Sequence, residues 1–207
     1  HVMADDHVFA CEFDLVDEGI VEVPDPTGLF VSRHEKPVAG TCVTVTMEGR
    51  RPLLAEVQAL SVKTSNPSPR RTSSGLDSSR VAMILAVLSK HCKIDLSSDD
   101  VYTASVGGAR LVEPSVDLAV AIATASAHQD RPAPHDLVAF GEVGLAGEVR
   151  KVSNLTARLR EAERIGFARA VVPAGSEGLE TFKGTISISA VRTIAEAIRC
   201  LDPTAPY

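Results

Sequence analysis

Alternating apolar and polar positions predict two neighbouring strands in the first third of the chain. Between residues 41 and 47, valines and Met47 alternate with threonines, which is the period of a half-buried strand. Residues 53–62 are predicted to return beside it. Residues 8–31 carry short strand and turn signals, and residues 63–74, rich in Ser, Pro and Arg, are expected to form an exposed loop.

A helical period appears in later segments. Pro114 suits the first turn of a helix that runs to about His128, because its missing N–H would have no partner there. Residues 154–166 predict another helix that ends at Gly166, and residues 193–196 form a capping box for the last one. The inward positions of the helix that begins near residue 75 are Leu76, Val81, Ile84, Leu85, Leu88 and Cys92, and those of the 154–166 helix are Leu155, Leu159 and Ala162.

Further strands are predicted between these helices, at residues 101–106, 137–142, 168–173 and 186–191. Alternating strands and helices after Leu53 predict an α/β domain of about 150 residues.

Composition places the chain among ordinary soluble domains. Of its 207 residues, 44% are hydrophobic and 23% are charged, and no apolar run reaches the ~18 residues of a membrane helix. The four cysteines, Cys11, Cys42, Cys92 and Cys200, are far apart and are expected to be reduced thiols of a cytoplasmic protein. We therefore expect no metal site and no membrane contact.

The charge is uneven along the chain, although the net value is −6. The segment before Arg33 is acidic, whereas the segment from Lys63 to Lys93 is basic apart from Asp77. The candidate DNA-binding residues are Lys63, Arg70, Arg71, Arg80, Lys90 and Lys93. The alternative is a solvated surface of mixed charge.

A Pro-Ser pair supplies a possible nucleophile. The run Glu113-Pro114-Ser115-Val116-Asp117 resembles the catalytic serine segment of Lon-type proteases, and residues 141–149 resemble the Lon segment that leads to the catalytic lysine. Counting from Gly141 places Thr156 at the lysine position. Because threonine cannot accept the serine proton, Ser115 and Thr156 are predicted to be vestigial, and the chain is predicted to have no catalytic residue.

Two other interpretations of these residues remain open. Lys151 could act as a relocated base for a working Ser–Lys peptidase, or Ser115 could be a plain hydroxyl in the first turn of a helix. Asp117 is expected to have a structural role, because a carboxylate in the first turn favours the helix dipole.

Longer segments resemble the bacterial RadA family of DNA-repair and recombination proteins, which is also called Sms. They are residues 21–30, 48–54, 56–60, 69–72, 75–77, 140–150 and 166–173, in the family's order. The resemblance covers essentially residues 10–200. It implies an α/β (α+β) Lon protease-like domain of the ribosomal protein S5 domain 2-like type, preceded by a short β-rich junction segment.

The resemblance also implies a division of the chain and a set of partners. Residues 1–40 would be a tag scar and a junction from a missing RecA-like ATPase domain, and residues 41–207 the Lon-like domain. ATP, magnesium and zinc would belong to N-terminal parts outside this chain, which has no G-x-x-x-x-G-K-[ST] loop. The family implies a cytoplasmic homo-hexamer that promotes branch migration, with DNA and the recombinase RecA as partners. A pure oligomerisation module without DNA contact is the alternative.

Overall fold

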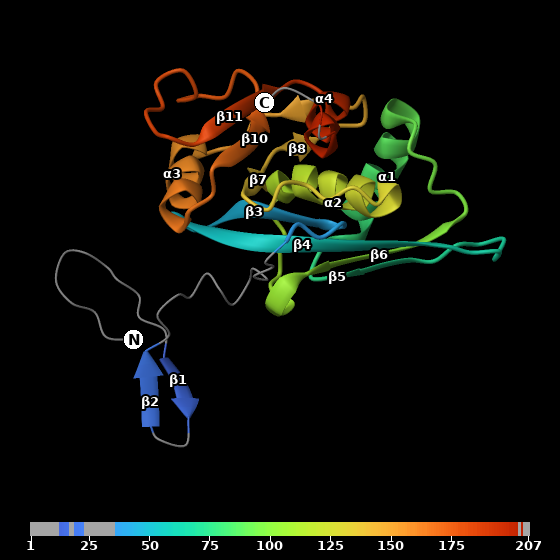
Figure 1. Ribbon diagram of the computed structural model, residues 1–207, viewed down its shortest axis with the longest axis horizontal. Coiled ribbons are helices and arrows are strands. Elements are labelled where there is room, and N and C mark those ends of the chain that lie inside the picture. The colour runs from blue at the N-terminus through green and yellow to red at the C-terminus, as the bar shows by residue number, and fades with distance from the viewer. Residues whose placement is uncertain (1–12, 17–18, 23–35, 203, 205–207) are drawn as a thin grey trace.

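A seven-stranded mixed sheet forms the centre of the fold (Figure 1). Its strand order is β11-β10-β7-β3-β4-β6-β5, and only the β3–β4 and β4–β6 pairs within it are antiparallel. The strands are β3 (Thr41–Glu48), β4 (Arg51–Lys63), β5 (Arg71–Ser74), β6 (Asp99–Ser105), β7 (Leu137–Ala139), β10 (Arg169–Pro173) and β11 (Ser187–Val191).

The computed structural model describes residues 13–16, 19–22, 36–202 and 204. The first two of these ranges are the strands β1 (Phe13–Val16) and β2 (Gly19–Glu22). They pair as an antiparallel hairpin, which confirms the strand signals at these positions. The rest of the predicted 8–31 segment, including the turn after Val23, lies outside the described residues. The boundary at residue 40 stays a prediction.

Helices cover both faces of the sheet, which confirms the predicted α/β class. One face packs against α1 (Ser78–Cys92), α2 (Asp117–Gln129) and α4 (Ile194–Ile198), and the other packs against α3 (Leu155–Ile165). A small hairpin of β8 (Glu142–Val143) and β9 (Val149–Arg150), and the 3-10 turns η2 (Val106–Gly108), η3 (Pro114–Val116) and η4 (Arg199–Leu201), complete the described fold.

Strand β4 explains why there are two cores. Its side chains alternate, so Ala55 and Val57 join the core beneath α1 and α2, whereas Leu54 joins the core beneath α3. Because both faces are covered there, residues 54–57 are all buried rather than alternately exposed.

The two helix ends that the sequence predicted, at Thr193 and Gly166, are confirmed. Thr193 caps α4 by accepting the Glu196 N–H at 3.2 Å. Asp77, a cap that the sequence patterns did not predict, accepts the Arg80 N–H at 3.0 Å at the start of α1. Gly166 ends α3 with a φ of 110°, a conformation that an L side chain rarely adopts.

Two predicted elements were wrong in detail. The predicted loop 63–74 contains the strand β5, which pairs in parallel with β6. The predicted strand 137–142 is split, because the Gly141 N–H donates to the Ser115 carbonyl at 2.8 Å and the Gly141 carbonyl accepts the Leu118 N–H at 3.0 Å. The backbone at Gly141 therefore leaves the sheet and forms its hydrogen bonds with the residues at the start of α2.

Three of the four cysteines, Cys42, Cys92 and Cys200, are free thiols, and Cys11 lies outside the described residues. Among the described residues no helix is long and apolar enough to cross a bilayer, and no group of three or more His, Cys, Asp or Glu side chains could hold a metal ion.

Candidate functional site

Ser115 lies at the junction of η3 and α2, where the Lon resemblance places a nucleophile. Pro114 opens this turn, and the Ser115 side chain is buried. The α3 helix, whose start corresponds to the position of the Lon lysine, packs on the same region of the sheet and contributes to the core that contains Val45 and Leu54. The fold therefore brings the two segments that resemble Lon together in space.

The side chain that reaches Ser115 is Arg158, and it is fully buried, with 0% of its side chain exposed. Its Nη1 donates to Ser115 Oγ at 3.2 Å and to the carbonyl of Val45 at 2.7 Å. Its Nε donates to the carbonyl of Ser153 at 2.8 Å, and its Nη2 forms an ion pair with Glu113. The guanidinium thus occupies the space beside the serine hydroxyl.

Glu113, whose side chain is 24% exposed, completes this pair. Its Oε2 accepts the backbone N–H of Met47 at 2.7 Å and the Thr46 hydroxyl at 3.1 Å. Burial by itself would raise the pKa of Glu113, but the hydrogen bonds from Arg158, Met47 and Ser115 hold it below its usual value. The carboxylate is therefore ionised beside a cation that cannot lose its proton near neutral pH.

The chemistry of this arrangement opposes nucleophilic catalysis. A serine hydroxyl becomes a nucleophile when a neighbouring group accepts its proton, and a guanidinium has only donors. Arg158 also stacks near the ring of Phe140, with its Cζ 5.8 Å from the ring centroid, so its position is fixed by packing as well as by charge.

Thr156 and Lys151 lie elsewhere. Thr156 Oγ1 is beside the backbone of Gly178, only 2.7 Å from where a Cβ on that glycine would stand. Lys151 is exposed, and the Cβ position of Gly175 is 3.9 Å from its Nζ. Among the described contacts none joins either side chain to Ser115, so the geometry does not support a relocated base.

Sequence reasoning missed Arg158, although a signal was present. It lies three residues after Leu155 and four before Ala162, both of which point into the core, so helical spacing puts it on the buried face. A charged residue on the apolar face of a helix requires a partner, and Glu113 was available next to the Pro-Ser pair.

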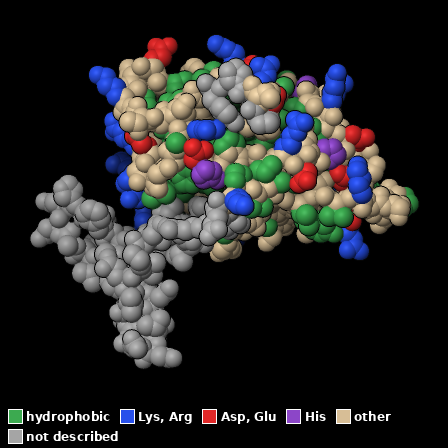
Figure 2. All heavy atoms as spheres, in the orientation of Figure 1, with side chains coloured by type: hydrophobic (Ala, Val, Ile, Leu, Met, Phe, Trp, Pro, Cys, Tyr) green, Lys and Arg blue, Asp and Glu red, His purple; other side chains and the backbone are tan. Residues whose placement is uncertain are grey.

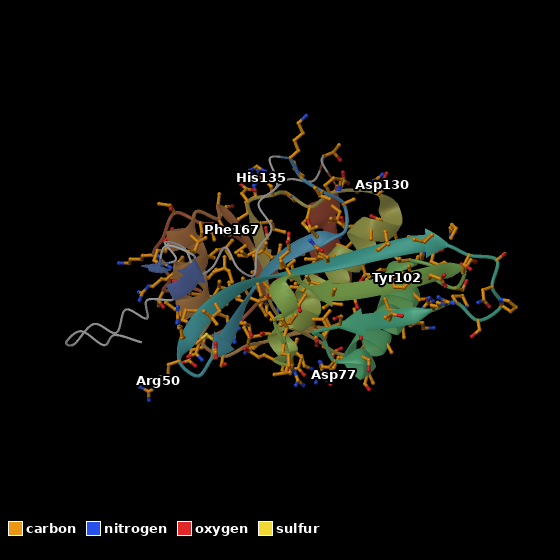
Figure 3. All side chains as sticks on the ribbon, turned by 90° about the horizontal axis from the view of Figure 1, so that it is seen from below. Arg50, Asp77, Tyr102, Asp130, His135 and Phe167 are labelled. Carbon is orange, nitrogen blue, oxygen red and sulfur yellow. The ribbon has the colours of Figure 1, made fainter. Side chains whose placement is uncertain are left out.

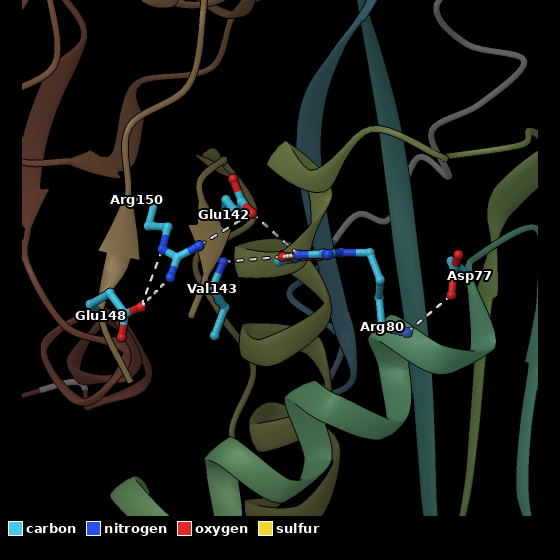
Figure 4. A network of polar contacts seen from close by, with 7 residues as sticks. Asp77, Arg80, Glu142, Val143, Glu148 and Arg150 are labelled. Carbon is cyan, nitrogen blue, oxygen red and sulfur yellow. Dashed lines mark hydrogen bonds and ion pairs between the residues drawn. The ribbon is translucent and has the colours of Figure 1, made fainter. Parts of the chain in front are cut away.

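Asp117 belongs to a second polar network, drawn in Figure 4. Its carboxylate accepts Arg80 Nε at 2.9 Å and the Val143 N–H at 3.1 Å. Arg80 also approaches Glu142 at 3.8 Å, and Arg150 approaches the same carboxylate at 3.9 Å. Burial raises the pKa of Asp117, against the opposing effect of the Arg80 hydrogen bonds. These contacts link α1, α2 and the β8–β9 hairpin, in agreement with the structural role expected for Asp117.

The candidate DNA-binding residues are divided by the fold. Lys63 Nζ pairs with Asp99 at 2.7 Å, and the Arg71 guanidinium donates to the backbone carbonyls of Asp99 and Leu96. These two cations therefore lie side by side at the ends of β4 and β6. Arg80 stands at the other end of α1, roughly 15 Å along the helix axis from Lys90, and is held by Asp117.

The remaining three candidates, Arg70, Lys90 and Lys93, are exposed. Lys93 follows the last turn of α1, whose loop leads back to Leu96 and hence to Arg71. The structure thus gathers the ends of β4, β5 and α1 into one basic region. DNA contact by these residues stays a prediction.

A second set of exposed arginines was not singled out from the sequence. Arg50 and Arg51 stand at the β3–β4 turn, and Arg160 and Arg164 lie on α3, where Arg164 pairs with Glu161 at 2.6 Å. Figure 2 shows Lys and Arg side chains along the edge of the molecule where α3 lies in Figure 1.

Comparison with known proteins identifies the family. Residues 78–176 match the model of ChlI, the ChlI subunit of Mg-chelatase. The chain is 46% identical to the DNA repair protein RadA of Mycolicibacterium smegmatis over 187 residues, which is 90% of this chain and 40% of that protein. It is 41% identical to RadA of Escherichia coli over 190 residues, which is 92% of this chain and 41% of that one. Over this stretch the chain belongs to the RadA family.

The chain spans about two-fifths of the length of these RadA relatives. A third relative, RadA of Synechocystis, is 44% identical over 82% of this chain and 34% of its own length. The names of these relatives describe them as DNA repair proteins. Two features described above therefore belong to a RadA-family domain. One is the Arg158–Glu113 ion pair with its hydrogen bond to Ser115, and the other is the basic region at the ends of β4, β5 and α1.

Proposed function

We propose that this chain is a proteolytically inactive Lon-like scaffold that contacts duplex DNA within a RadA-type recombination and repair ATPase. The observation that carries the first half is the hydrogen bond from the buried Arg158 guanidinium to Ser115 Oγ. A donor-only group fills the space in which a base would have to stand, and Thr156 replaces the lysine.

Incubation with unfolded casein tests the loss of peptidase activity. Wild-type chain and Ser115→Ala are expected to leave casein intact, and Thr156→Lys is expected to do the same, because Arg158 still fills the space beside the hydroxyl. Cleavage by the wild type that disappears in Ser115→Ala would overturn the proposal. Separate incubation with ATP is expected to show no turnover by this chain.

The basic region supports the second half of the proposal. Arg70, Lys90 and Lys93 are exposed. Phosphate contacts require positive charge without base-edge geometry, so binding is expected to be insensitive to sequence and to weaken steeply with salt. The opposing candidate is a pure oligomerisation module, favoured by the observation that Lys63, Arg71 and Arg80 are all occupied by groups of their own chain.

A triple substitution separates these two candidates. Replacing Arg70, Lys90 and Lys93 by alanine is expected to weaken duplex binding and to flatten its dependence on salt, with the oligomer size unchanged. The matched control is Arg50→Ala/Arg51→Ala, which changes two arginines of the second exposed set instead. If the triple variant breaks the oligomer while DNA affinity stays unchanged, the basic region belongs to assembly instead.

For the longer protein, we propose a homo-hexameric ring that uses ATP to promote branch migration in the cytoplasm, with RecA as a partner. ATP, magnesium and zinc would be held by parts outside this chain. The family resemblance supports this proposal, and a heterologous interface that closes by rotation would form the ring. Light scattering on the full-length protein is expected to give a hexamer, and a strict monomer at micromolar concentration would contradict it.

A further inference from the structure

One part of the central sheet has an open face. The strands β4, β6 and β5 turn one set of side chains toward α1 and α2, and the opposite set points away from those helices. In the away-facing set Leu60 lies directly opposite Tyr102, and Tyr102 lies opposite Thr72 on the next strand. Figure 3 views this face and shows Tyr102 on the open strands.

The same face is buried a few residues away. Leu54 and Val45 are covered by α3, but the described helices do not extend over the second half of β4. Leu60 is 56% exposed and Val62 is 45% exposed, which is unusual for large hydrophobic side chains in the described part of the chain. A contiguous apolar extension of a buried face indicates a surface that another protein surface covers.

The side chains of this face indicate whether a nucleic acid or a protein would bind there. The outward side chains are Gln58, Leu60, Val62, Thr72, Ser74, Asp100, Tyr102 and Ala104. This set holds one carboxylate and no lysine or arginine, and the exposed Arg70 stands only at its border beside Asp100, so a phosphate backbone would find little counter-charge around Leu60. An apolar protein surface gains from burial of the cross-strand pair Leu60–Tyr102 and the neighbouring Val62.

The path of the chain indicates which protein surface would cover this face. Residues 36–40 lead into β3, and the Gly40 carbonyl accepts the Ala59 N–H at 2.7 Å, immediately beside Leu60. The junction that would join the preceding domain therefore enters the sheet beside Leu60. A domain attached through this junction docks in an intramolecular step, which raises its effective concentration at this end of the sheet.

The RadA relatives are about two and a half times as long as the stretch that matches this chain, which covers 40% of one of them. We propose that in the longer protein the domain preceding residue 36 docks through an apolar surface onto Leu60, Val62 and Tyr102. This proposal rests on the assignment of the chain to a longer RadA-type protein. It gives the apolar outer face of β4 and β6 a role distinct from that of the basic region.

The test uses the full-length protein with Leu60→Glu/Val62→Glu. The matched control is Leu145→Glu, a side chain that is 71% exposed in the turn between β8 and β9. Limited proteolysis at the junction before residue 36 is expected to accelerate about tenfold or more in the double variant, because two apolar contacts are lost, and to stay at the wild-type rate in the control.

A milder variant, Tyr102→Ala, repeats the test if the double variant does not fold. Junction cleavage at the wild-type rate in a folded variant overturns the proposal. A changed oligomer size with unchanged junction cleavage also overturns it, because it assigns the face to a contact between copies. Casein and duplex DNA assays on the same variants separate the two conclusions: faster junction cleavage with failed DNA binding by the wild type would refute the proposed function alone.

Discussion

At the scale of single residues, the ion pair of Arg158 and Glu113 fixes the surroundings of Ser115. Arg158 donates to Ser115, Val45 and Ser153 and pairs with Glu113, so one side chain joins α3 to β3 and to the turn before α2. These contacts compensate the burial of the Arg158 charge, and removing Arg158 leaves the half-buried Glu113 carboxylate without its cation.

Arg158→Met tests this interdependence. The substitution keeps much of the side-chain volume but leaves Glu113 without its cation, so the free energy of unfolding is expected to fall by about 3–5 kcal/mol. Denaturant titration measures the change, and Arg160→Met on the exposed face of α3 is the control, expected within about 0.5 kcal/mol of wild type. Equal effects in the two variants would show that the buried pair adds no stability.

At the scale of elements, two glycines beside β3 show how the surroundings of a turn decide whether a side chain fits. Gly40 precedes β3 with a φ of 89°, and a Cβ there would stand 2.3 Å from the Ala59 carbonyl oxygen. Gly49, in the β3–β4 turn, has a φ of 61°, but a Cβ there would meet nothing within 4 Å. The two glycines share the left-handed conformation and differ in their surroundings.

Gly40→Ala and Gly49→Ala therefore form a matched pair. Both variants are expected to lose about 1–2 kcal/mol from the unfavourable φ. Gly40→Ala is expected to lose more, because the backbone of β4 must also move to admit the methyl group. Thermal unfolding monitored by circular dichroism compares the two, and an equal loss in both would contradict the close approach of Gly40 to Ala59.

At the scale of the whole molecule, Asp99 joins the end of β4 to α2. Its buried carboxylate accepts the Ser61 hydroxyl at 2.6 Å, pairs with Lys63 at 2.7 Å and contacts His128 Nδ1 at 2.9 Å. Burial would raise its pKa, but the hydrogen bonds from Lys63, Ser61 and His128 lower the pKa of Asp99 from 3.8 to about 2.

A lowered pKa for an acid means that its contribution to stability is present above the unfolded pKa. The contribution of Asp99 is therefore complete above about pH 4 and is lost as the pH falls toward about 2. Asp99→Asn is expected to be less stable than wild type near neutral pH, with a difference that shrinks through this window. Unfolding at a series of pH values measures it, with the exposed Asp130→Asn as control. A difference that does not depend on pH would refute the assignment.

The sequence by itself determined the elements, and to a large extent the family. Period-two and period-3.6 patterns located most of the sheet and the main helices, and local capping chemistry placed two helix ends at Thr193 and Gly166. The count from Gly141 also predicts that Thr156 stands at the position of the Lon lysine. These are local properties, since neighbours in the chain decide them.

The tertiary structure decided what local patterns do not contain. Strand β5 exists because β6 offers it a parallel partner, and the split after β7 exists because Gly141 bonds to the start of α2. Arg158 and Glu113 are 45 residues apart in sequence, and only the packing of α3 on β3 makes them a pair. Pairing between distant groups depends on how the elements pack, so it becomes visible only when the fold has brought them together.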